Sequence, residues 1–171
     1  MSFGRRTAQG TSYGIIGLGR FGTALAIELA SHGREILVID ADEDRIKQLR
    51  EYTENAFVVH SLDKNTLLET GIQNCEVAVV CIGEQMDVSI LTTLHLKGLG
   101  IGRVIAKAAS AEHGEILEKL GAEVVYPERD MAVRLARRLE PSKILNYIEL
   151  SEKIDISKVM IPNRFLNHRL V

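Results

Sequence analysis

The stretch Tyr13-Gly-Ile-Ile-Gly-Leu-Gly-Arg-Phe-Gly22 decides the fold, because it joins an apolar strand directly to a glycine-rich turn. Its glycines follow the spacing GxGxxG at Gly17, Gly19 and Gly22, and an apolar helical pattern follows over residues 23–32. The first glycine permits a tight turn, the second lets a pyrophosphate approach the backbone, and the third allows close packing of helix on strand. The helix N-terminus offers free N–H groups to phosphates. The stretch therefore predicts a nucleotide-binding strand–loop–helix unit.

A carboxylate ends the second predicted strand. The β-branched and leucine run of residues 36–39 leads into Asp40, close to the spacing of about 20 residues expected for a ribose-binding acid. Such a carboxylate accepts hydrogen bonds from ribose hydroxyls and repels a 2'-phosphate. Residues 41–44 add negative charge, and no arginine lies close enough in sequence to serve a 2'-phosphate. NADP is therefore disfavoured, and NAD(H) or an adenine nucleotide fits. The alternative is a glycine-rich turn followed by an aspartate that only caps the next helix.

Strand-like and helical patterns alternate through the following hundred or so residues. Further strands are predicted at 56–59, 77–82, 104–106 and 124–126, and Asp42 and Ser110 are predicted as helix caps. Strands separated by helices indicate parallel units with right-handed crossovers. The strands read as continuous apolar runs, which is typical of sheets covered on both faces. We predict a doubly wound α/β domain with helices on both faces of a parallel sheet.

The chain departs from this alternation near its end. Residues 130–139 predict a helix with an apolar stripe and three arginines, which Pro141 ends, and residues 144–150 predict a second short helical stretch. Apolar residues recur as in a strand from Ile154 to Ile161. Too few residues follow to complete another domain, so we expect the beginning of a truncated second module.

The composition excludes several classes of protein. The chain has 171 residues, of which 46% are hydrophobic, and its 21 basic and 23 acidic residues leave a net charge of -2. This balance gives no reason to expect a nucleic-acid partner. Cys75 and Cys81 lie in apolar surroundings and are predicted to be core thiols in a reducing compartment. No signal peptide and no apolar run near the roughly 20 residues that span a bilayer are visible, so we expect a soluble cytoplasmic protein.

Catalytic motifs are absent from the sequence. HExxH, CxxC, GxSxG and the Walker lysine do not occur, and the histidines are most simply surface or packing residues. A dehydrogenase would need a catalytic acid or base and a substrate-binding region beyond the nucleotide half. The sequence favours a protein that is not an enzyme. The nucleotide-binding half of an NAD-dependent oxidoreductase is the alternative.

Several separated motifs resemble the RCK/KTN (TrkA-N-like) family, the regulators of potassium conductance that gate bacterial Trk/Ktr transporters and potassium channels. The resemblance covers about residues 13–150 and includes the arginine and phenylalanine inside the glycine loop. The other motifs are Leu37-Val-Ile-Asp40, Leu68-Glu-Thr-Gly-Ile72, Val79-Val-Cys-Ile-Gly83, Ala106-Lys-Ala108, Leu120-Gly-Ala-Glu-Val-Val-Tyr-Pro-Glu128 and Asp130-Met-Ala132. Residues 159–170 look like the first residues of the family's C-terminal ligand-binding lobe.

The resemblance implies an architecture and a role. It divides the chain into a flexible tail (1–12), a Rossmann nucleotide-binding lobe (13–128), a crossover helix and dimerisation region (129–150) and the start of a truncated C-terminal lobe (151–171). Lobes of the family form dimers within an octameric ring. The stripe on the crossover helix would pack on a neighbouring subunit, or alternatively on its own sheet.

The expected role is that of a nucleotide-sensing gating subunit of a potassium transporter. Nucleotide exchange would change the shape of the ring, which controls an integral-membrane potassium transporter subunit at the cytosolic face of the plasma membrane. Another possibility is an RCK module of a channel, whose ligand would be NADH or a cation. Such modules usually follow a transmembrane segment.

The resemblance also extends the nucleotide site beyond the glycine loop. Arg20 matches a loop arginine that reaches nucleotide phosphates, in some members across the dimer interface; the alternative is a solvated arginine. Lys107 and Glu128 match positions near the phosphates. A carboxylate there favours a divalent cation between it and the phosphates, so Glu128 is also a candidate metal ligand. The full candidate set is Gly17, Leu18, Gly19, Arg20, Phe21, Gly22, Asp40, His60, Ser61, Ile82, Gly83, Lys107 and Glu128.

One position departs from the family pattern. Many members carry Gly-Asp where this chain has Val59-His60, so an acidic contact near adenine is missing. His60 either contacts the base or is a simple strand-end histidine. The difference favours ATP/ADP over NAD(H) as the ligand, with NAD(H) as the alternative.

Overall fold

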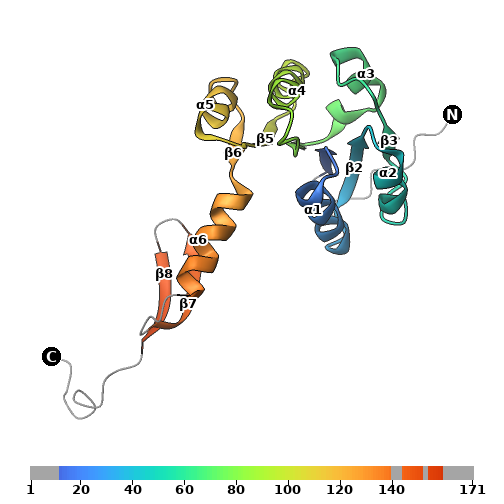
Figure 1. Cartoon of the computed structure of the whole chain (residues 1–171). Coiled ribbons are helices and arrows are strands. Elements are labelled where there is room, and N and C mark those ends of the chain that lie inside the picture. The colour runs from blue at the N-terminus through green and yellow to red at the C-terminus, as the bar shows by residue number, and fades with distance from the viewer. Residues whose placement is uncertain (1–11, 140–143, 152–153, 160–171) are drawn as a thin grey trace, which may run out of the picture. The chain divides into compact units, whose positions relative to one another are not determined.

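A six-stranded parallel sheet forms the centre of the first of two compact units, residues 1–127 (Figure 1). The computed structural model describes residues 12–139, 144–151 and 154–159. The strand order is β3-β2-β1-β4-β5-β6, so the chain reverses direction across the sheet between β1 and β4. The strands are β1 (Ser12–Ile16), β2 (Glu35–Asp40), β3 (Ala56–Val58), β4 (Val77–Val80), β5 (Arg103–Lys107) and β6 (Glu123–Val125). This order is that of the Rossmann fold, whose ligands bind where the strand order reverses.

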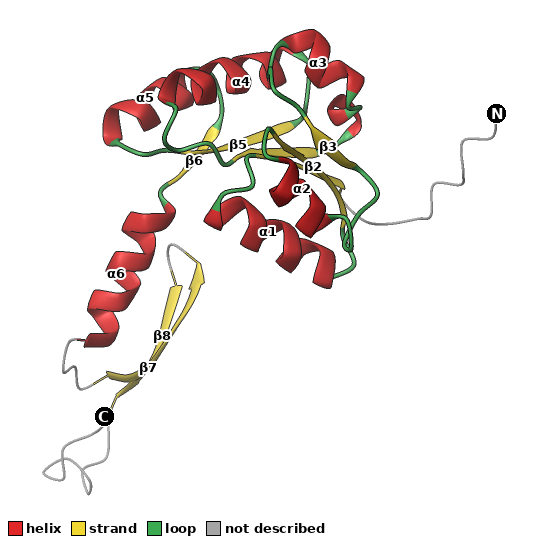
Figure 2. Cartoon of the chain, turned by 45° about the vertical axis from the view of Figure 1, so that its right-hand side comes forward, coloured by secondary structure: helices red, strands yellow, loops and turns green. Residues whose placement is uncertain are grey.

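Helices cover both faces of this sheet, as the sequence predicts. Figure 2 shows α1 and α2 on one face and α3, α4 and α5 on the other. The helices are α1 (Arg20–Ser31), α2 (Glu43–Leu49), α3 (Lys64–Glu69), α4 (Met86–Gly98) and α5 (Ala111–Lys119), with a short 3-10 turn, η1, at Ile72–Asn74. The expected caps are confirmed: Asp42 accepts hydrogen bonds from the backbone of Asp44 and Arg45, and Ser110 accepts one from that of His113.

Each central strand sends alternate side chains into two separate cores. Ile15 and Val79 belong to the core beneath α1 and α2, whereas Ile16 and Val80 belong to the core beneath α3, α4 and α5. All four are nearly or fully buried. Because both sides of the pleat are apolar, the period-two alternation of an ordinary half-exposed strand disappears from the sequence. Cys75 and Cys81 are buried and unpaired, which confirms the prediction of core thiols.

The second compact unit, residues 128–171, corrects one prediction. Helix α6 spans Pro127–Leu139, but residues 144–150, predicted as a helix, form strand β7 (Ile144–Ser151). This strand pairs antiparallel with β8 (Ile154–Val159), which the sequence does predict. A short segment rich in β-branched and aromatic residues gains more from a paired strand than from an isolated helix of two turns. Pro141, Ile161 and residues 160–171 lie outside the described residues, as does most of the predicted tail.

His113 is fully buried at the start of α5. Its Nδ1 accepts a hydrogen bond from the Ala109 N–H at 3.3 Å, so the neutral ring carries its proton on Nε2. No group in the described part of the chain hydrogen-bonds to that Nε2. Burial without a partner for the charged form lowers the pKa of His113 below its usual 6.5. This histidine is therefore a packing residue whose burial favours the neutral ring.

We expect acidification to destabilise the fold through His113. Its pKa is lower in the folded state, so the unfolded chain binds more protons as the pH falls below about 6.5, and the free energy of unfolding decreases. Replacement of His113 by glutamine should reduce the fall in Tm between pH 7.5 and pH 5.5, measured by thermal denaturation. His32 is exposed, so His32→Gln is a matched control that should keep the wild-type response. An equal fall in Tm for the wild type and His113→Gln would contradict this assignment.

Candidate functional site

The glycine loop connects β1 to α1 at the carboxyl edge of the sheet. Gly17 has a φ of 90°, a conformation that side chains rarely adopt, and its N–H donates to the carbonyl of Ile39 at 2.9 Å. A Cβ on Gly22 would overlap the carbonyl oxygen of Gly17, whereas a Cβ on Gly19 would meet nothing within 4 Å. The backbone conformation thus requires the first glycine, packing requires the third, and the second leaves open space above the backbone. This is the arrangement that a phosphate needs for close approach.

The N-terminus of α1 faces this open space without a side-chain cap. The first intrahelical bond runs from the N–H of Thr23 to the carbonyl of Gly19, at 2.9 Å. The three preceding amides, which belong to residues 20–22, therefore have no partner within the helix. Such amides, together with the helix dipole, bind anions. The side chains of Leu18 and Phe21 pack into the core beneath α1, so they support the loop and leave ligand binding to its backbone.

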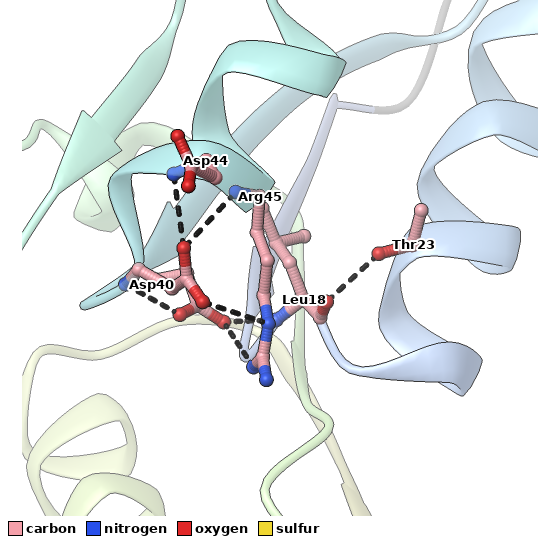
Figure 3. A network of polar contacts seen from close by, with 6 residues as sticks. Leu18, Thr23, Asp40, Asp44 and Arg45 are labelled. Atoms are coloured by element: carbon pink, nitrogen blue, oxygen red, sulfur yellow. Dashed lines mark hydrogen bonds and ion pairs between the residues drawn. The ribbon is translucent and has the colours of Figure 1, made fainter.

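Asp40, the last residue of the neighbouring strand β2, contacts the glycine loop at Leu18 (Figure 3). This carboxylate is only 9% exposed; Oδ2 accepts a hydrogen bond from the Leu18 N–H at 2.5 Å and Oδ1 one from the Asp42 N–H at 2.8 Å. A carboxylate has about four acceptor positions, so capacity remains for a ribose hydroxyl. Asp40 thus braces the glycine loop and stands where the ribose is expected. The bracing contact is missing from the sequence prediction.

From the sequence, no arginine is expected close enough to serve a 2'-phosphate, but the structure brings Arg45 to this carboxylate. Arg45 Nη1 is 3.5 Å from Asp40 Oδ2, and Arg45 Nε is 3.4 Å from Asp42 Oδ2. Helix α2 begins directly after its cap, Asp42, and its first turn brings position 45 back over the end of β2 (Figure 3). The predicted cap at Asp42 could have indicated this contact, because Arg45 lies three residues after it and therefore on the same helix face.

A groove of about 570 Å³ opens beside the glycine loop on the side of α1 and α2. Its polar lining includes Thr23, whose hydroxyl donates to the Leu18 carbonyl at 2.8 Å, and Gln48. Arg20 and Arg45 supply its charge, and no carboxylate is among the lining residues that the structure describes. The groove is lined by Leu18, Gly19, Arg20, Thr23, Ala24, Ile27, Arg45 and Gln48. Thr23, Arg45 and Gln48 are absent from the predicted site.

Three further candidates meet where β1, β4 and β5 end. A Cβ on Gly17 would come 3.0 Å from Ile82 Cγ1, and a Cβ on Gly83 would come 3.3 Å from both Cε and Nζ of Lys107. Lys107 therefore extends along Gly83, and Ile82 lies against the first glycine of the loop. The structure brings these residues together at the reversal of strand order, the usual position of a ligand in this fold.

The remaining candidates are His60, Ser61 and Glu128. His60 is exposed after β3 and lines a different pocket, of about 270 Å³, while the Ser61 hydroxyl donates to Asp63 Oδ2 at 2.8 Å. Glu128 is exposed in the first turn of α6 and belongs to the second unit. Among the residues that the structure describes, no three His, Cys, Asp or Glu side chains gather closely enough to hold a metal ion. The role of Glu128 as a metal ligand therefore stays a prediction.

The strand order, the glycine loop and the carboxylate at the end of β2 define a nucleotide-binding domain of the Rossmann type. Comparison with known families identifies it further: the chain belongs to the TrkA-N family, whose model matches residues 13–127. It is 36% identical over 160 residues to the Ktr system potassium uptake protein C of Bacillus subtilis (strain 168), covering 93% of this chain and 72% of that protein. It is 38% identical over 149 residues to the Ktr system potassium uptake protein A of the same organism, covering 86% of this chain and 67% of the relative.

Solved structures agree with the family assignment. The TrkA-N domain of the inner membrane protein YbaL from Escherichia coli superposes with a TM-score of 0.68 at 19% identity, covering 78% of this chain and 100% of that domain. GsuK bound to ADP superposes with a TM-score of 0.61 at 27% identity, covering 76% of this chain and 34% of GsuK. The expected family and fold are therefore confirmed. No helix in the described part of the chain is long and apolar enough to cross a membrane.

Proposed function

We propose that this chain is a nucleotide-sensing regulatory subunit of a potassium uptake system, acting without catalysis. The observation that carries the proposal is the uncapped N-terminus of α1 above the open space at Gly19, beside the braced carboxylate of Asp40. The family and the Ktr relatives supply the potassium uptake system. The ring of dimers, the membrane transporter subunit and the cytosolic location belong to the proposal and rest on the resemblance.

The ligand in this proposal is ATP or ADP, with NAD(H) as the alternative. The ribose would bind Asp40, and the phosphates would bind the amides of residues 20–22. The ADP complex of GsuK, an RCK-containing relative by fold, supports a nucleotide with a pyrophosphate. Arg20 is exposed at the start of α1 and Lys107 lies along Gly83, and the proposal assigns both cations to the phosphates. The resemblance adds a divalent cation at the phosphates to this proposal.

Regulation requires that the ligands bind two conformations unequally. A nucleotide with equal affinity for both conformations shifts nothing, however tightly it binds. The γ-phosphate distinguishes ATP from ADP and carries additional negative charge. We therefore assign the discrimination to cations that reach the terminal phosphate in only one conformation of the assembly, with Arg20 as the first candidate.

A thermal-denaturation panel with ATP, ADP, NAD, NADH and NADPH, each with and without magnesium, tests the proposal. At 100 times its dissociation constant a ligand stabilises the fold by about 2.7 kcal/mol, which raises the Tm of a domain of this size by about 5–10 °C. We expect ATP and ADP to give this rise. If only NAD or NADH raised the Tm, NAD(H) would be the ligand in place of ATP and ADP. If no nucleotide raised the Tm, the sensing role would be refuted.

We expect Arg20→Gln to weaken ATP binding about tenfold and ADP binding less, because it removes a charge-assisted hydrogen bond to phosphate. Isothermal titration calorimetry of both nucleotides measures this difference. Arg34 is exposed just before β2, at the opposite edge of the sheet, so Arg34→Gln is the matched control with the same change of charge. Unchanged ATP affinity in Arg20→Gln, or equal losses in the two variants, would contradict the role of Arg20.

A further inference from the structure

Strand β3 forms one edge of the six-stranded sheet, and no strand in the described part of the chain pairs with its outer side. Toward β2, the Asn55 carbonyl accepts from the Val38 N–H and the Val59 N–H donates to the Asp40 carbonyl, both at 2.9 Å. Alternate residues of a strand point their peptide groups to opposite sides, so Val58 points its N–H and carbonyl away from β2. The edge therefore offers a donor and an acceptor to an added strand.

A pocket of about 270 Å³ lies beside this edge and is lined by residues from β3 and α3 and from the turn between them. Phe57 and Val59 give it apolar walls, and both pack with the core beneath α3, α4 and α5. The side chains of an added strand alternate between the two faces of a sheet. Every second side chain of such a strand would therefore lie on the face where this pocket opens.

The hydroxyl groups of the pocket are acceptors only. The Thr66 hydroxyl donates to Asp63 Oδ2 at 2.8 Å, and the Thr70 hydroxyl donates to the Leu67 carbonyl at 2.7 Å. A hydroxyl has a single proton, so both oxygens keep free lone pairs and have no proton left to give. A group rich in N–H donors suits this lining.

The charge of the pocket points to a cation. Glu69, the last residue of α3, is exposed, and its carboxylate has no partner in the part of the chain that the structure describes. No lysine or arginine is among the described lining residues, and the neutral ring of His60 adds an acceptor nitrogen. A guanidinium pairs with a carboxylate through two parallel N–H groups and stacks on aromatic rings such as that of Phe57. The pocket therefore favours an arginine side chain.

We infer that the edge of β3 and this pocket form a docking site for an extended segment of a partner protein, which pairs with Val58 and places an arginine beside Glu69. Strand addition supplies backbone hydrogen bonds, and a pocket for an alternate side chain supplies specificity. An edge of three residues offers few backbone bonds, so the arginine decides which segments bind. The inference does not depend on the proposed nucleotide site.

Isothermal titration calorimetry at pH 8 with blocked pentapeptides tests the docking site. We expect acetyl-Thr-Val-Arg-Val-Thr-amide to bind about tenfold more tightly than the same peptide with glutamine in place of arginine, because a charge-assisted hydrogen bond is lost. Glu69→Gln should remove this preference. N-acetyl-arginine amide, which has the side chain without a strand, should bind about tenfold more weakly than the arginine peptide. Equal affinities of the two pentapeptides, or no binding of either, would refute the site.

Glu118→Gln is the matched control, because it makes the same change at an exposed glutamate of α5 outside the pocket. It should keep the preference for arginine, and loss of that preference here would contradict the role of Glu69. Val58→Pro removes the outward N–H, which edge strands tolerate, and should weaken the arginine peptide. If N-acetyl-arginine amide binds as tightly as the peptide, strand addition is refuted whatever the stability of that variant. A dimer in sedimentation that Val58→Pro abolishes would instead place a second copy on the edge and overturn the inference.

Discussion

Replacement of Gly22 by alanine is expected to lower the Tm by about 10 °C or more and to abolish nucleotide binding, since a backbone clash of this kind costs several kcal/mol. The new methyl group would overlap the carbonyl oxygen of Gly17 and lie 3.2 Å from Cys81 Cβ. Neither neighbour can yield easily. Gly17 is held by its hydrogen bond to Ile39, and Cys81 is buried. Relief would require α1 to move away from the sheet and carry its N-terminal amides out of position.

Gly19→Ala is the matched control for this prediction, because it makes the same chemical change three residues earlier. A Cβ at this position has nothing within 4 Å, so the Tm should stay within about 2 °C of the wild type. Nucleotide binding should still weaken, because the methyl group would enter the space proposed for phosphate. Thermal denaturation followed by titration with ADP separates the two effects. Equal stability of the two variants would show that the helix does not pack on the loop as described.

Replacement of Asp40 by alanine is expected to eliminate nucleotide binding and to destabilise the fold by about 3 kcal/mol, because two backbone N–H groups lose their acceptor. Those donors belong to Leu18, inside the glycine loop, and to Asp42, which caps α2. Arg45 would lose a charge partner at the same time. The ribose would lose the acceptor that orients it. Urea denaturation measures the change in stability, and calorimetric titration with ADP measures the change in affinity.

Asp42→Ala separates these two roles of Asp40. It removes the cap of α2, which costs about 1 kcal/mol, but leaves the brace on Leu18 intact. Nucleotide affinity should change far less than in Asp40→Ala. If Asp40→Ala still bound ADP, Asp40 would not be the ligand of the ribose. If that variant were as stable as the wild type, Asp40 would not brace the loop.

The nucleotide-binding core of the fold was predictable because its signals are local. The glycines of the loop, the cap at Asp42 and the buried runs of β1, β2 and β4 each leave a pattern within a few residues of sequence. Burial of both faces of the sheet makes those runs continuously apolar. Asp40 could be placed beside the loop for the same reason, since one crossover fixes its distance from the loop. Its role toward a ribose stays a prediction.

The missed features depend on contacts between distant parts of the chain or on the exact path of a turn. Strand β7 forms because β8 pairs with it, and its own residues do not settle the choice between helix and strand. The bond from Leu18 to Asp40 joins residues 22 positions apart. The return of Arg45 over β2 depends on where α2 begins, and a shift of one residue would turn its side chain by about 100° around the helix.

The single carboxylate of Asp40 braces the glycine loop and is also the proposed ligand of the ribose. This double role restricts how ligand preference can be altered in this domain. In the proposed site, a change at Asp40 that alters recognition of the ribose would also release the loop proposed to bind the phosphates, so the two ends of a nucleotide could not be tuned independently at this position. Arg45 carries no such constraint, because it is half exposed and braces no backbone group. Protein engineers who seek a new cofactor preference in this scaffold should start from the arginine and leave the aspartate untouched.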